Sequence, residues 1–86
     1  MNPYVVHCKR DYYNVYIGRP SKYGNPFEIG KDGTRDEVIE KFRVYMLKTF
    51  TEKEIIEDLK GKILGCWYSP LNCHGDVLST IANKEE

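Results

Sequence analysis

The sequence contains no long hydrophobic run. A helix that spans a membrane needs about 18 or more consecutive apolar residues, and no such stretch occurs among the 86 residues. The first residues, Met-Asn-Pro-Tyr, also lack the basic and apolar regions of a secretion signal. We therefore expect a cytoplasmic protein without a membrane partner, and the length predicts a single domain over residues 1–86.

An excess of charge of either sign is absent as well. The 13 Lys and Arg residues balance the 13 Asp and Glu residues, which is too little positive charge for a strong nucleic-acid footprint. Bulk nucleic acid is therefore not an expected partner. Residues 1–27 nevertheless hold four basic residues against one acidic residue, a net charge of +3, which is enough to line one pocket for a small anion.

Cysteine is scarce and odd in number, with Cys8, Cys66 and Cys73 alone. A secreted mini-protein of this size normally carries an even set of cysteines in a disulfide framework, so we expect reduced thiols. A zinc site needs about four ligands, usually in closely spaced pairs, and the sequence has no C-x-x-C pair. We predict no metal site and no cofactor.

Three segments predict strands. Tyr4–Cys8 and Val15–Gly18 are rich in β-branched and aromatic residues. The link between them is too short for a parallel crossover, so these two strands either form a hairpin or are not direct neighbours. The continuous apolar run Ile63–Trp67 predicts a strand buried on both faces, as in a parallel sheet.

Helices are indicated by two capping boxes, Thr34–Glu37 and Thr51–Glu54. Apolar residues follow the first box at helical spacing and predict a core stripe, and Gly61 is typical of the end of the second helix. A third helix is predicted from about residue 72 onward. Together these elements predict an α/β fold, a small three-layer or two-layer Rossmann-like domain with a short, mostly parallel sheet of about three strands and three helices.

Two polar loops, Arg19–Phe27 and Cys66–Asp76, hold most of the unusual residues. Ligands bind at the carboxyl ends of parallel strands, so loops that follow two such strands are expected to form one site. Arginine and lysine hold phosphate or carboxylate oxygens, glycines let backbone amides approach a ligand, and aromatic faces stack on rings. The predicted ligand-binding residues are Arg19, Ser21, Lys22, Tyr23, Gly24, Asn25, Trp67, Tyr68 and Gly75. We expect the ligand to be a small anion, a nucleotide or another phosphorylated metabolite.

A catalytic interpretation stays open. His74 and Asp76 are candidate acid and base groups, and Cys73 near a helix N-terminus is a candidate nucleophile in an enzyme that acts on a nucleoside, nucleotide or sugar phosphate. A protein–protein adaptor is a further alternative, which an exposed apolar patch around Tyr12 and Tyr13 would favour. A chain this short leaves much of its surface exposed, so a homodimer also stays open.

Two motifs resemble those of one family. Tyr16–Phe27 resembles an I-G-R-P-S-K-W-G-N-P-F signature, and Leu64–Asp76 resembles an L-x-C-W-C-x-P-x-x-C-H-G-D signature. Both belong to a bacterial and phage domain of unknown function, DUF4326, and the resemblance implies that the two loops act as one unit in a bacterium or a phage-infected host. Tyr23 stands where Trp is usual. Tyr68 stands where Cys is usual, so a metal or disulfide that needs that Cys would lack a partner here.

Overall fold

The computed structural model describes residues 4–69, 71 and 73–84. It contains three strands and three helices in the chain order β1 (Val5–His7), β2 (Val15–Tyr16), α1 (Arg35–Thr49), α2 (Glu52–Leu59), β3 (Leu64–Cys66) and α3 (His74–Ala82). The α/β fold expected from the sequence is confirmed. Pro70 of the second motif and Asn72, near which the third helix was expected to begin, lie outside the described residues.

The strands form one sheet in the order β1-β3-β2, and both neighbouring pairs are parallel. Leu64 of β3 lies opposite Val5 on one side and Val15 on the other. Thus β1 and β2 are not direct neighbours, which decides between the two arrangements that the short link allowed. All three residues of β3 are buried, as the apolar run predicted, whereas Trp67 just after the strand is 48% exposed.

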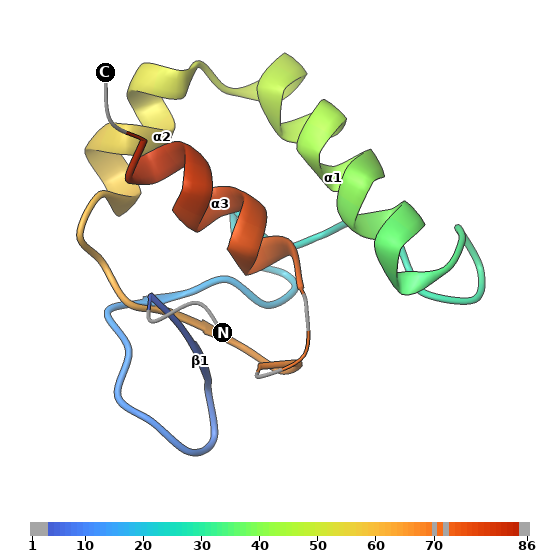
Figure 1. Ribbon diagram of the computed structural model, residues 1–86, viewed down its shortest axis with the longest axis horizontal. Helices are drawn as coiled ribbons and strands as arrows, with labels where there is room; N and C mark the ends of the chain where they lie inside the picture. The colour runs from blue at the N-terminus through green and yellow to red at the C-terminus, as the bar shows by residue number, and fades with distance from the viewer. Residues whose placement is uncertain (1–3, 70, 72, 85–86) are drawn as a thin grey trace.

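The three helices lie on one side of the sheet, which makes the fold two-layered (Figure 1). Helix α3 contacts β1, β3 and both other helices, so it connects the layers. Its residue Leu78 and the central residue of α1, Phe42, are fully buried in the core between them. On the other side of the sheet, Gly65 lies under the ring of Tyr13, and a Cβ at this position would come within 2.7 Å of that ring.

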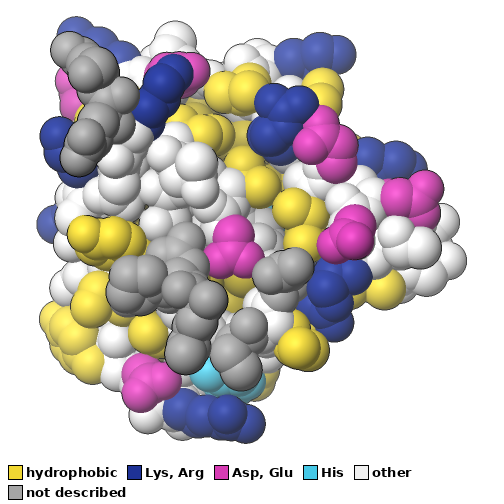
Figure 2. Space-filling view, viewed as in Figure 1, with side chains coloured by type: hydrophobic (Ala, Val, Ile, Leu, Met, Phe, Trp, Pro, Cys, Tyr) yellow, Lys and Arg dark blue, Asp and Glu magenta, His cyan; other side chains and the backbone are white. Residues whose placement is uncertain are grey.

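The surface matches the balanced composition. On the face drawn in Figure 2, basic and acidic side chains are interspersed and are not gathered by sign. Within the part of the chain that the structure describes, no helix has the length and apolar character needed to cross a membrane.

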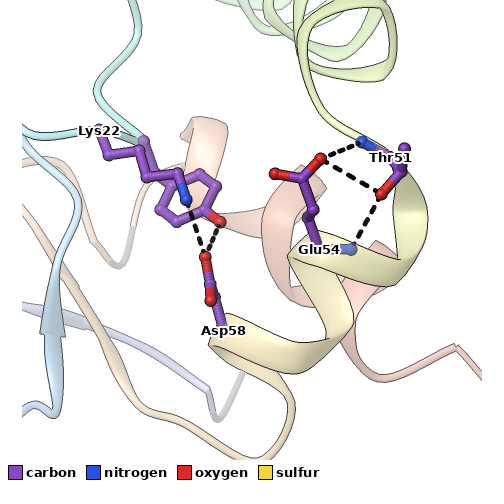
Figure 3. Close-up of polar contacts among 5 residues, drawn as sticks. Lys22, Thr51, Glu54 and Asp58 are labelled. Atoms are coloured by element: carbon purple, nitrogen blue, oxygen red, sulfur yellow. Dashed lines mark hydrogen bonds and ion pairs between the residues drawn. The ribbon is translucent and has the colours of Figure 1, made fainter.

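Both predicted capping boxes are present. The Thr34 hydroxyl accepts from the backbone N–H of Glu37, and the Glu37 carboxylate accepts from the N–H of Thr34 at 2.9 Å. Thr51 and Glu54 repeat this exchange at the start of α2 (Figure 3). Gly61 follows the end of α2 with a φ of 73°, a conformation that favours glycine.

The second capping box makes a testable contribution to stability. Thr51→Ala removes the side-chain acceptor at the N-terminus of α2, so we expect the free energy of unfolding to fall by about 1 kcal/mol in urea titrations. Thr49→Ala is a matched control, because the Thr49 hydroxyl only donates to the carbonyl of Tyr45 within α1 and its loss should change stability by less than about 0.5 kcal/mol. Equal losses in the two variants would contradict a capping role for Thr51.

Candidate functional site

The two polar loops meet over the start of α1 and line one shallow cleft with a volume of about 20 Å³. They meet because β2 and β3 run parallel and end at the same edge of the sheet. The cleft contains five residues that the sequence placed in the site: Arg19, Asn25, Tyr68, Cys73 and His74. Five more line it that were not named as individual site residues: Phe27, which ends the first predicted loop, and Ile29, Arg35, Val38 and Ile39.

Positive charge dominates this cleft. It is lined by two guanidinium groups, those of Arg19 and Arg35, and none of the described residues that line it is acidic. Arg19 forms an ion pair with Glu28 at 3.3 Å, but both side chains are about half exposed, so the pair is weakly held. The Arg35 guanidinium lies 5.0 Å from the centre of the Tyr68 ring. Two planar forks of N–H donors therefore border one opening.

His74 is a buried wall of the cleft. Its Nε2 lies 2.6 Å from the carbonyl oxygen of Ile17, and since a carbonyl only accepts, Nε2 carries the proton and donates it. Its ring also meets the Phe42 ring edge-on, with the centres 4.9 Å apart. Burial lowers the pKa of His74, and the positive charge of Arg19 adds to this effect, so the ring is neutral at neutral pH. His74 thus ties the start of α3 to the residue that follows β2.

Cys73 and Asp76 form a third capping box, at the start of α3. The Cys73 sulfur accepts from the N–H of Gly75 at 3.3 Å, and the Asp76 carboxylate accepts from the N–H of Cys73 at 3.2 Å. Asp76 and His74, the candidate acid and base, therefore bond two different backbone groups and do not form a pair with each other. Cysteine is an unusual N-cap, so the sequence rules for capping did not reveal this box.

Gly75 has a packing role. A Cβ there would lie 2.8 Å from Cδ1 of Ile17 and 3.0 Å from Cγ1 of Val5, so only glycine lets α3 lie this close to the strands. The sequence analysis assigned Gly75 to backbone contact with a ligand, whereas here it faces the core. Gly24 packs in a similar way, because its Cβ would come within 3.1 Å of the Arg19 Cα.

Lys22 and Tyr23 extend toward α2 and away from the cleft. Asp58 accepts hydrogen bonds from the Tyr23 hydroxyl and, at 3.0 Å, from the Lys22 ammonium (Figure 3). The Tyr23 ring is only 4% exposed and packs against Phe50 at 5.5 Å. Its face is therefore part of the core and offers no surface on which a ligand ring could stack.

The remaining predicted residues are Ser21, Asn25 and Trp67. Ser21 belongs to a turn in which its N–H donates to the carbonyl of Gly18, and within the described residues its buried hydroxyl oxygen has no hydrogen-bond partner. Asn25 closes its own turn, since its carbonyl oxygen accepts from the N–H of Phe27 at 2.9 Å. Trp67 donates to the Tyr16 hydroxyl at 2.7 Å and is not among the residues that line the cleft.

The sequence analysis missed Arg35, the second cation of the cleft. The capping box at Thr34 placed Arg35 in the first turn of α1, but nothing in the sequence showed which side of that turn faces the loops. The described part of the chain holds no cluster of three or more His, Cys, Asp or Glu side chains that could bind a metal ion.

The contact between Tyr23 and Asp58 predicts a pH dependence. Hydrogen bonds from Tyr23 and Lys22 hold the pKa of the Asp58 carboxyl below its usual value. A group with a lowered folded-state pKa adds stability above its unfolded pKa, about 4 for Asp, and loses that contribution as the pH falls through the folded value. Tyr23→Phe should therefore cost most stability near neutral pH, and its deficit should shrink below about pH 4 in urea unfolding.

Tyr12→Phe is the control for this measurement, because Tyr12 is 76% exposed and its hydroxyl accepts only from the nearby Asn14 amide. We expect the free energy of unfolding of Tyr12→Phe to match that of the wild type at every pH. The same pH profile in both variants would show that the Asp58 contact is not its cause.

Comparison with known proteins gives three findings. The chain matches the family described as Domain of unknown function (DUF4326) over residues 5–84. It is 35% identical over 85 residues to an uncharacterized 12.4 kDa protein from the nrdA-td intergenic region of Enterobacteria phage T4, covering 93% of this chain and 77% of that protein. It is 36% identical over 95 residues to the uncharacterized protein R718 of Acanthamoeba polyphaga mimivirus, covering 90% of this chain and 68% of that protein. No solved structure matches the chain significantly.

Proposed function

This chain belongs to the DUF4326 family, and we propose that it binds a nucleotide or a related phosphorylated metabolite in the cleft between loops 19–27 and 66–76. One observation carries the proposal. Arg19 and Arg35 come from different segments, yet both border one cleft whose described lining residues include no carboxylate. A small anion with several oxygens is the ligand that such a lining favours.

The chemistry of the two arginines favours phosphate. A guanidinium group offers parallel N–H donors that match two oxygens of one phosphate, and charge-assisted hydrogen bonds of this kind are short and strong. Cys73 and His74, at the start of α3, form the adjoining wall. The Asp76 carboxylate at this helix start offsets the positive end of the helix dipole, so the attraction for an anion comes from the two arginines.

The size of the cleft limits which part of a ligand it can hold. Its volume of about 20 Å³ is far below the range for ligand pockets that enclose their ligand, about 300–1,000 Å³. The arginines would therefore hold a phosphate group at the opening, and the sugar and base of a nucleotide would lie outside it on the surface. Tyr68, 40% exposed and beside Arg35, is the aromatic side chain that supports this placement.

Two alternatives have weaker support. An enzyme that uses His74 and Asp76 would first have to release both from the backbone groups that they bond. A protein–protein adaptor is favoured by the exposure of Tyr12 at 76%, but Tyr13 lies over Gly65 and is partly buried. Neither alternative explains why two arginines line one cleft.

Calorimetric titration with inorganic phosphate, a nucleoside monophosphate, a nucleoside diphosphate and a sugar phosphate tests the proposal. We expect at least one phosphorylated compound to bind, and its unphosphorylated parent to bind at least about tenfold more weakly. Arg19→Ala and Arg35→Ala should each raise the dissociation constant about 10- to 100-fold, because a hydrogen bond to a charged group contributes about 1.5–3 kcal/mol.

Arg43→Ala is the matched control for the arginine variants. Arg43 lies on the same helix as Arg35, but it forms an ion pair with Glu40 on the surface and is not among the described residues that line the cleft. Lys22→Ala should also retain binding, since Lys22 is engaged by Asp58. Absence of binding across the panel, or equal weakening by all four variants, would contradict the proposal.

A further inference from the structure

Two buried cysteines come together beside the cleft. Cys66 ends β3 and Cys73 caps α3, and their sulfur atoms lie 3.1 Å apart, although both are free thiols. A disulfide has a sulfur–sulfur distance of about 2.05 Å, so the two sulfurs need to approach by only about 1 Å to bond. We propose that Cys66 and Cys73 form a redox-active dithiol that a peroxide oxidises to an intramolecular disulfide.

The fold gives the two sulfurs unequal access. Cys66 is 0% exposed, since it points from the central strand into the helix layer. Cys73 is 3% exposed and lines the cleft, so a molecule as small as hydrogen peroxide reaches this sulfur first. Cys73 is therefore the attacking sulfur and Cys66 the resolving one. The pair does not need position 68, where Tyr68 stands in place of the Cys of the family motif.

The reaction proceeds in two steps that balance. The Cys73 sulfur attacks one peroxide oxygen, the O–O bond breaks, and the departing hydroxide takes up the thiol proton as water, which leaves a sulfenic acid. The Cys66 sulfur then attacks the sulfenic sulfur, the S–O bond breaks, and the second hydroxide leaves as water with the Cys66 proton. Two electrons pass from the sulfurs to the peroxide.

The contact between the sulfurs affects the two thiols differently. A thiolate is the nucleophilic form, and either sulfur can donate its proton to the other. This hydrogen bond lowers the pKa of Cys66 and, together with burial, raises that of Cys73. These shifts favour loss of a proton from Cys66 and oppose it at Cys73, so access through the cleft, and not a lowered pKa, makes Cys73 the sulfur that a peroxide meets first. The inference stands independently of the ligand proposed for the cleft.

Trypsin provides a direct test, because residues 63–84 lie between Lys62 and Lys84 with no other Lys or Arg between them and contain both cysteines. The folded protein is treated with hydrogen peroxide, alkylated, and digested without reductant. We expect peptide 63–84 to lose the mass of two hydrogen atoms and to take no alkyl group, while the peptide with Cys8 is alkylated. Dithiothreitol should restore both thiols.

Variants identify the sulfurs. Cys8→Ser should react at the wild-type rate. Cys73→Ser retains a good N-cap for α3, and it should slow the oxidation of Cys66 by about tenfold or more, because the sulfur that lines the cleft is gone. Cys66→Ala should leave Cys73 at the sulfenic stage, trapped by dimedone, and circular dichroism checks that both variants fold.

Three results would overturn the proposal. One is a peptide 63–84 that keeps two alkylatable thiols in the folded wild type while the urea-unfolded chain oxidises. Another is a disulfide that joins Cys8 to either partner. The third is oxidation of Cys66 at the wild-type rate in Cys73→Ser.

Discussion

The central strand β3 needs hydrogen-bond partners along both of its edges, because it is fully buried and its backbone groups cannot bond to water. Strands β1 and β2 supply these partners, each in parallel register with Leu64 and Gly65. Parallel pairing brings the carboxyl ends of β2 and β3 to one edge of the sheet. The loop with Arg19 and the loop with Tyr68 therefore start side by side, and the cleft depends on this arrangement.

Helix α3 turns that edge into a defined cleft. Gly75 lets the helix lie close to Ile17 and Val5, and the His74 ring donates to the carbonyl of Ile17. These contacts hold the start of α3 against Ile17, which lies two residues before the Arg19 loop. His74 and Asp76, which look catalytic in the sequence, thus bond backbone groups of the cleft wall. Arg19 and Arg35 provide the charge of the cleft.

Local features were the most predictable from the sequence. The capping boxes at Thr34 and Thr51 depend on groups within four residues of each other, so short-range patterns identify them, and both helices begin where expected. The apolar run through Leu64 also predicted a buried strand with parallel neighbours. The start of α3 was harder to define, because its N-cap is Cys73, a residue that capping rules do not favour.

By itself, the sequence determined the α/β class, the starts of α1 and α2 and the two loops that meet, since these follow from spacing and residue type. Only the tertiary structure decided which side chains of those loops face the cleft. Tyr23 and Arg19 are four residues apart in one irregular loop, yet one packs in the core against Phe50 and the other lines the cleft. A loop has no repeating period, so the direction of a side chain depends on packing against distant elements, which for Tyr23 are Asp58 of α2 and the Phe50 ring.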